Sequence, residues 1–222
     1  MSMDVTNDNN LNWPKGKYNK FLILPVPVTD RLCRDAVFFL CSNSYYNNEN
    51  GDKVTPSLPP DLDPINSKKP AHHKLSQPIE LESLFQSAVG TNDGSSSVAH
   101  DYKRFQSHPS RKQSLMKCKA ISEIIGCIQQ VIDNQVSGYI PMKISVLYSL
   151  PHGDEQAFHV DDVRVDGAIE KEGEMLSVIF ALQNSTHLDI AVERDVRKTI
   201  SIPSSFMILF SGTSVSYTHL TL

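Results

Sequence analysis

The feature that most constrains this chain is a series of short β-type segments that fills its last third. These segments are residues 142–150, 156–162, 175–183, 188–192, 197–202 and 205–212. Turn-forming Gly, Pro and Asn residues separate them, as is typical of strands joined by short connections. Because a helical region precedes them, the pattern predicts an α+β fold in which helices pack on an antiparallel β-sandwich or jelly roll.

The helical region contains one segment with a clear period. In residues 114–136, isoleucine and valine side chains recur at the 3, 4 and 7 spacing of a single buried helix face. Gly138 stands where a C-terminal cap belongs. The period predicts one long helix that lies against the sheets.

Weaker patterns precede this helix. Residues 20–28 predict a strand that Pro25 and Pro27 confine to a sheet edge, and residues 29–41 predict a helix capped by Thr29 or Asp30. A short helix is predicted over 79–90. The Asn-, Pro- and Ser-rich stretches 42–74 and 91–112 predict long loops.

The chain therefore divides into four parts. We expect residues 1–20, rich in Asn and Asp, to be disordered. Residues 21–113 form a loop-rich N-terminal α/β region, and residues 114–214 hold the long helix and the β-rich core. Residues 215–222 are treated separately below.

Composition excludes several classes of function. A net charge of −4 and a pI near 6.0 argue against nucleic acid or an anionic membrane as a partner. Four cysteines without a CxxC pair indicate neither a disulfide framework nor a zinc site. The N-terminal residues do not resemble a secretory signal, and no apolar run reaches the roughly 20 residues of a membrane span. These features predict a cytoplasmic or nuclear protein.

The candidate site lies in DEQAFHVDDVR, residues 154–164. His159 and Asp161 share one face of a strand, because strand side chains alternate with period 2. An imidazole and a carboxylate that converge inside a barrel are two ligands of the 2-His-1-carboxylate triad of Fe(II) oxygenases. His-x-Asp alone is a weak signal, and the chain holds a second copy at His187 and Asp189.

The order of motifs resembles the double-stranded β-helix of the 2-oxoglutarate- and Fe(II)-dependent oxygenases, especially the prolyl-hydroxylase-like branch. The matching pieces span residues 114–214 and are Tyr148, Pro151, Gly153, His159, Asp161, Leu182-Gln183 and Phe210-Ser211-Gly212. The segment DYKRFQS (101–107) also resembles an arginine–glutamine segment of some members.

The resemblance implies that His159 and Asp161 are the first two iron ligands, in preference to His187 and Asp189. It implies Fe(II) as the metal and 2-oxoglutarate as the co-substrate, which Tyr148 would contact; a core aromatic is the alternative for Tyr148. The substrate would be a small molecule or a protein side chain.

The third ligand is expected directly after Phe210-Ser211-Gly212, near positions 215–217. The sequence there is VSYTHLTL (215–222), which reads as the translation of a common transposase sequencing adapter. We therefore expect the natural reading frame to leave this sequence near Thr213, and we expect residues 215–222 to be an artefactual tail. On this interpretation His219 is not the distal ligand, and the basic residue that anchors 2-oxoglutarate is also lost.

Two alternatives remain open. One is a catalytically inactive jelly-roll or cupin-like binding domain, in which His159 and Asp161 are ordinary polar residues. The other, a zinc hydrolase, fits poorly because the chain has no HExxH motif and no cysteine ligands at useful spacing.

Overall fold

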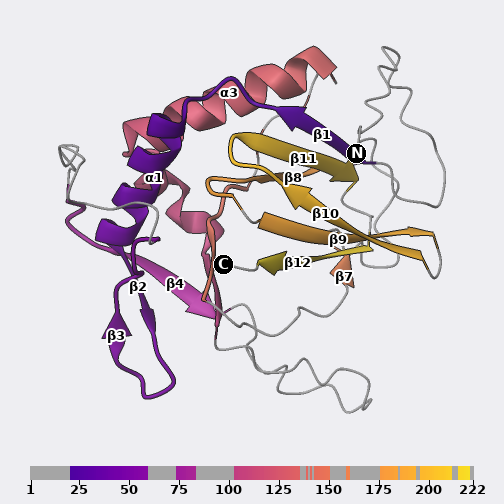
Figure 1. Ribbon diagram of the computed structural model, residues 1–222. Helices are drawn as coiled ribbons and strands as arrows, with labels where there is room; N and C mark the ends of the chain where they lie inside the picture. The colour runs from indigo at the N-terminus through magenta and orange to yellow at the C-terminus, as the bar shows by residue number, and fades with distance from the viewer. Residues whose placement is uncertain are drawn as a thin grey trace, which may run out of the picture.

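The structure is a computed structural model in mixed α+β form (Figure 1). It describes residues 21–59, 74–83, 103–135, 139, 141, 143–150, 159–160, 176–184, 186–193, 196–211 and 215–220. Its strands form three sheets in which every pairing except one is antiparallel among the described residues. The predictions for residues 1–20 and for Gly138 fall outside the described residues.

A three-stranded sheet lies at the centre, in the order β1 (Phe21–Pro25), β11 (Phe206–Ser211) and β8 (Leu176–Phe180). β11 is the middle strand, and its residues 207–210 are all 0% exposed. Such a continuous apolar run is typical of a strand that is covered on both faces. β1 occupies the edge, as its prolines predict.

A four-stranded sheet faces it, in the order β10 (Val196–Ile202), β9 (Thr186–Glu193), β12 (Val215–Leu220) and β7 (His159–Val160). One face of this sheet carries buried Leu188, Ile190, Ile200 and Ile202. These four pack in a single cluster with Ile208 and Phe210 of β11. The two sheets therefore enclose a shared apolar interior.

Helices cover the opposite face of the three-stranded sheet. α3 (Lys119–Gln135) places Ile132 against Met207 of β11 and against Val26, which follows β1. Figure 1 shows this helix running across β1 and β11. The long helix predicted over 114–136 is confirmed in substance. It is nevertheless preceded by a break, since η1 (Pro109–Arg111) and α2 (Lys112–Leu115) end before α3 begins.

α1 (Asp30–Asn43) confirms the predicted helix and its cap, because Thr29 Oγ1 accepts a hydrogen bond from the Leu32 amide at 3.2 Å. At its other end buried Asn43 joins two segments. Its Nδ2 donates to Phe39 O at 2.9 Å, and its Oδ1 accepts from the Leu75 amide at 2.8 Å.

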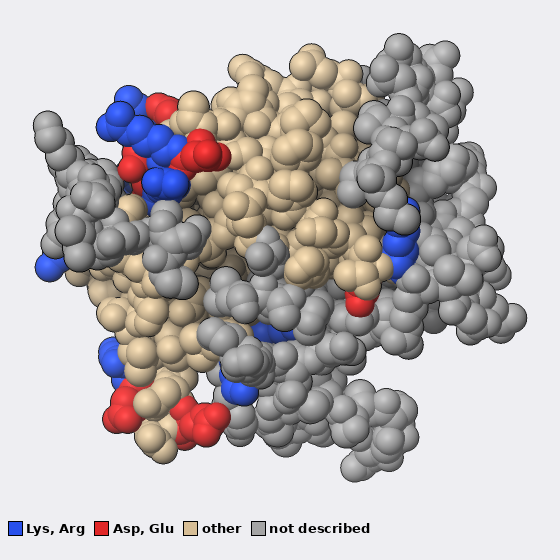
Figure 2. Space-filling model, in the orientation of Figure 1, with Lys and Arg blue, Asp and Glu red and all other residues tan. Residues whose placement is uncertain are grey.

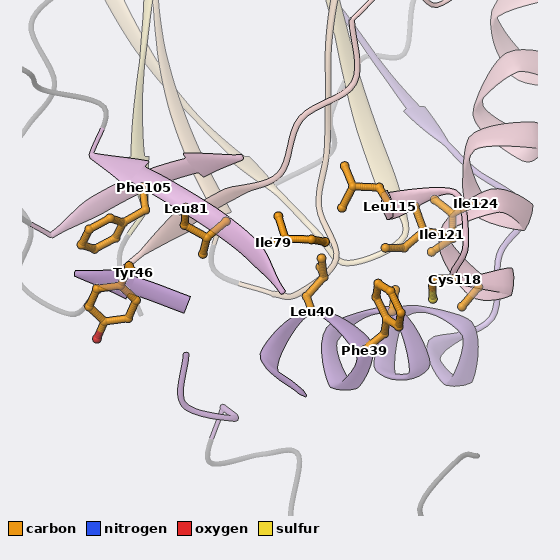
Figure 3. Close-up of a cluster of buried hydrophobic side chains, with 12 residues drawn as sticks. Phe39, Leu40, Tyr46, Ile79, Leu81, Phe105, Leu115, Cys118, Ile121 and Ile124 are labelled. Carbon is orange, nitrogen blue, oxygen red and sulfur yellow. The ribbon is translucent and has the colours of Figure 1, made fainter. Parts of the chain in front are cut away.

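A five-stranded sheet completes the fold, in the order β3 (Lys53–Val54), β2 (Ser44–Asn47), β4 (Ile79–Ser83), β5 (Arg104–Ser107) and β6 (Leu147–Ser149). Figure 3 shows its side chains meeting those of α1 and α3 in one apolar cluster. In that cluster Tyr46 and Phe105 stack with ring centroids 4.3 Å apart.

The helix predicted over 79–90 is wrong over residues 79–83, which form strand β4, and its remaining residues lie outside the described ones. Ile79 and Leu81 are 1% and 4% exposed, whereas Glu80 is partly exposed and Glu82 is exposed, so burial follows the period of a strand. The loops predicted over 42–74 and 91–112 are also wrong in part. They contain β2 and β3, and β5 with η1, respectively.

The later strands follow the predicted segments closely, except that residues 142–150 and 156–162 provide only β6 and β7 within the described parts. β12 was not predicted as a strand. Its sequence VSYTHL is rich in β-branched and aromatic residues, which favour extended structure.

Charged side chains of both signs are mixed on the face shown in Figure 2, mainly near the outer end of α1 and on the β2–β3 hairpin. The part of this face over the sheets and α3 that the structure describes is largely uncharged. The described part of this face therefore has no single-sign patch that would attract a polyanion.

Candidate functional site

The candidate site is built from strand β7, which begins at His159. β7 pairs with β12, and position 159 is the direct Cα partner of Ser216. Ser216 is in turn the partner of Ile190 in β9. Directly opposed residues of antiparallel strands share one face of the sheet, so positions 159, 216 and 190 belong to the same face.

That face is the one that borders the shared apolar interior. Ile190 and its neighbour Leu188 are both 0% exposed and pack against the three-stranded sheet. Position 159 thus lies at the edge of the interior face. Asp161 lies outside the described residues.

The second His-x-Asp motif occupies the other face of the same sheet. His187 and Asp189 alternate along β9 with buried Leu188 and Ile190, so they are directed away from the apolar interior. The register places His219 opposite His187 and Tyr217 opposite Asp189. Position 219 is therefore on the opposite face from position 159.

Asp189 is itself unusual. Its Oδ1 is buried, and no hydrogen-bond donor reaches it among the residues that the structure describes. A buried carboxylate oxygen without a donor is unfavourable for stability.

Tyr148, the predicted co-substrate contact, lies in β6 of the five-stranded sheet. Its ring is 5.9 Å from that of Tyr46 and 6.4 Å from that of Phe105, measured between centroids. The structure therefore places it in an aromatic cluster, which is the core alternative considered for this residue. Position 159 belongs to a different sheet.

The environment of Tyr148 favours its neutral phenol. Burial, followed by the nearby Tyr46, raises the pKa of Tyr148 from 10.0 to about 12, against an opposing backbone hydrogen bond from Ser57. A folded pKa above the unfolded one gives a contribution to stability that is fully present below pH 10 and is lost as the pH rises towards 12.

We expect Tyr148→Phe to remove part of this alkaline loss, because phenylalanine cannot ionise. Urea unfolding of both proteins at about pH 8 and again at about pH 11 measures the effect. The variant should lose less stability than the parent between the two conditions. Parallel losses would contradict the role assigned to this phenol.

Arg104 belongs to the segment DYKRFQS, which resembles the arginine–glutamine segment of some oxygenases, and it is a buried charged residue. It is 1% exposed in β5 and pairs in register with Ser149 of β6. Gln106 follows it on the same face and donates from Nε2 to Ser145 Oγ at 2.8 Å. The burial of Arg104 could not be predicted from the sequence, because the composition of residues 91–112 is that of a polar loop.

Two surface hollows are lined by residues of α3 and its neighbours and not by strand β7. They are shallow, have volumes of about 440 and 510 Å³, and flank Gly126 on the surface of α3. Within the described residues, His, Cys, Asp and Glu side chains form no group of three able to hold a metal. None of the described helices is both long and apolar enough to cross a bilayer.

Comparison with known proteins yields no relative: neither a protein-family model, nor a curated protein, nor a solved structure matches this chain.

Proposed function

We propose that the natural protein is an Fe(II)- and 2-oxoglutarate-dependent dioxygenase of the hydroxylase type, and that its β-rich part is a double-stranded β-helix, or jelly roll. The observation that carries this proposal is the register of β7. It puts position 159, the histidine of the His-x-Asp motif, on the interior face of a sheet that packs against a second sheet.

The strand pairing supports the jelly-roll part. β9 pairs with β10, β8 with β11, and β7 with β12, so antiparallel pairs nest outward from the β9–β10 hairpin. Successive pairs alternate between the four-stranded and the three-stranded sheet. This folded-over ribbon is the winding expected of a jelly roll.

In this proposal His159 and Asp161 hold the iron. The third ligand would come from β12, because position 216 lies directly opposite position 159 and side chains at such positions have Cβ atoms about 5 Å apart. The residue at 216 is serine, and a neutral hydroxyl is a poor substitute for imidazole on Fe(II). The donors of this chain thus do not complete the triad.

Bound iron and 2-oxoglutarate would together supply the oxidising power for hydroxylation of a C–H bond. The contribution of the chain is the fixed direction of its ligands and an apolar interior that keeps water away from the site. The resemblance gives Tyr148 the role of co-substrate contact, whereas its place in the aromatic cluster with Tyr46 and Phe105 favours the core role. The substrate is a small molecule or a protein side chain.

The experiment that tests the proposal is Ser216→His. We expect this variant to bind Fe(II), or Co(II) as a spectroscopic substitute, more tightly than the parent by more than about tenfold, because a third ligand joins the first two. Isothermal titration under anaerobic conditions measures the affinity. Adding His159→Ala or Asp161→Ala to this variant should abolish the gain.

The matched control is Tyr217→His, which puts the same imidazole one residue further along β12 and so on the opposite face. It should leave metal affinity unchanged. Equal gains in both variants, or a gain in neither, would contradict the site.

Ser216 also favours a second candidate, a catalytically inactive jelly-roll or cupin-like binding domain. If Ser216→His gains no metal, and the natural reading frame has no histidine at this position either, this candidate replaces the dioxygenase.

A further inference from the structure

The outer side of α3 carries one line of exposed residues that is centred on a glycine. Lys119, Gly126 and Asp133 follow one another at seven-residue spacing, so successive members are rotated by only about 20° around the helix axis. All three are exposed, and the Lys119 side chain is 90% exposed. Figure 1 shows α3 along the upper edge of the molecule. The line therefore faces solvent.

The centre of this line is open on both sides. Gly126 lines both surface hollows of α3, which lie on opposite sides of the helix. A Cβ atom built on Gly126 meets no other atom within 4 Å. The distance between two packed helices depends on the side chains at their contact, so a second helix can approach α3 most closely at this glycine.

The charges at the two ends of the line are opposite and equidistant from Gly126. Lys119 and Asp133 each lie seven residues away, which is about 10 Å along the helix axis. Where two copies of α3 cross antiparallel at Gly126, Lys119 of each copy lies opposite Asp133 of the other. A parallel crossing would put like charges together. Lys119 also forms a 3.6 Å ion pair with Glu123 of its own helix, and its ammonium has further donors for a second carboxylate.

The polar residues beside the line follow the same rule. Glu123 and Gln130 line the hollow on one side of Gly126, and Ser122 and Gln129 line the hollow on the other. In an antiparallel pair Glu123 lies near Gln130 of the second copy, where the carboxylate accepts from the amide. Ser122 lies near Gln129 of the second copy, where the hydroxyl donates to the amide oxygen. The whole exposed face is thus complementary to an antiparallel copy of itself.

We propose that this face of α3 is a homodimer interface, in which two copies of the chain pair through antiparallel α3 helices that cross at Gly126. The arrangement is isologous, so every contact occurs twice. One pair of helices is a small interface, and its Kd is on the order of micromolar. The inference stands on α3 and is independent of iron.

Sedimentation equilibrium of the 222-residue chain over about 1–200 μM measures the association. We expect a reversible equilibrium between monomer and dimer. Gly126→Leu should raise the Kd of the dimer by at least about tenfold, because the leucine side chain separates the two helices. Urea unfolding should show a monomer that is no less stable than the parent, because leucine is the better helix former and the space at Gly126 is open. A Kd that stays the same in Gly126→Leu would overturn the proposal.

Charge reversal tests the antiparallel register. Lys119→Glu and Asp133→Lys should each raise the Kd by about tenfold or more, because like charges then meet at both ends of the pair. Mixed in equal amounts, the two variants should form a heterodimer with a Kd within about threefold of the parent, since opposite charges meet again. Lys117→Glu is the matched control, because Lys117 is exposed but lies outside α3, and it should leave the Kd unchanged.

Four results would each contradict the interface. They are a parent chain that stays monomeric at about 200 μM, single charge variants that dimerise like the parent, a mixture that does not pair, and a control that weakens the dimer as much as Lys119→Glu does.

Discussion

Phe210→Ala should lower the free energy of unfolding by about 3–5 kcal/mol, the range for deleting a buried aromatic ring from a core. Phe210 is 0% exposed in the middle strand β11 and packs between the two sheets against Leu188, Ile190, Ile200 and Ile202 of the facing sheet. Alanine would leave a cavity at the place where the sheets meet. Urea unfolding monitored by circular dichroism measures the loss.

Phe21→Ala is the matched control, because Phe21 is the register partner of Phe210 in edge strand β1. Phe21 is only partly buried, and the Lys198 ammonium lies 5.7 Å from the centre of its ring. The same chemical change should cost less than half as much there. Equal losses would contradict the greater burial of Phe210 in the interior that the two sheets share.

Ile190→Asp should destabilise the protein by more than about 4 kcal/mol, enough to prevent folding of a marginally stable domain. Ile190 is 0% exposed, and aspartate would put an unpaired carboxylate into an apolar interior. Soluble yield and urea unfolding, where the protein folds, are the measurements.

Asp189→Ile is the control, since it moves the same two residue types one position along β9. Asp189 Oδ1 is buried without a donor among the described residues, so isoleucine should be neutral or stabilising. If Asp189→Ile lowers the free energy of unfolding more than Ile190→Asp does, the inner and outer faces of β9 are the reverse of those described here. Position 159 would then lie on the outer face as well, and the register would no longer support an iron site.

The same face of β9 therefore determines both the stability of the protein and the position of the proposed iron site. Among the described residues, position 159 is connected to Ile190 through Ser216 of β12. Whatever establishes that Ile190 is interior also establishes the face of the His-x-Asp strand. A stability experiment on a residue that touches no ligand thus tests the proposed site.

Local pattern predicted much of this fold. The 3, 4 and 7 spacing of isoleucines predicted α3, Thr29 predicted the start of α1, and Gly, Pro and Asn punctuation predicted strands β8 to β11. These signals are read within one element, where backbone geometry and side-chain period suffice.

Residues 79–83 show where local pattern fails. The short sequence IELES fits either a helix or a strand, and it became β4 because β5 pairs with it and β2 lies parallel to it. In the same way, Asn- and Tyr-rich residues 44–47 became β2 because Tyr46 packs against Phe105. Tertiary partners override weak propensity in both cases.

The sequence by itself determined the elements with strong periods, the paired His and Asp at 159 and 161, and the likeness of residues 215–222 to adapter translation. Only the tertiary structure decided that position 159 faces position 216 and that His187 and Asp189 lie on the outer face. The physical reason is range. Period and turn chemistry act over neighbouring residues, whereas strand order and register depend on contacts between segments far apart in the chain.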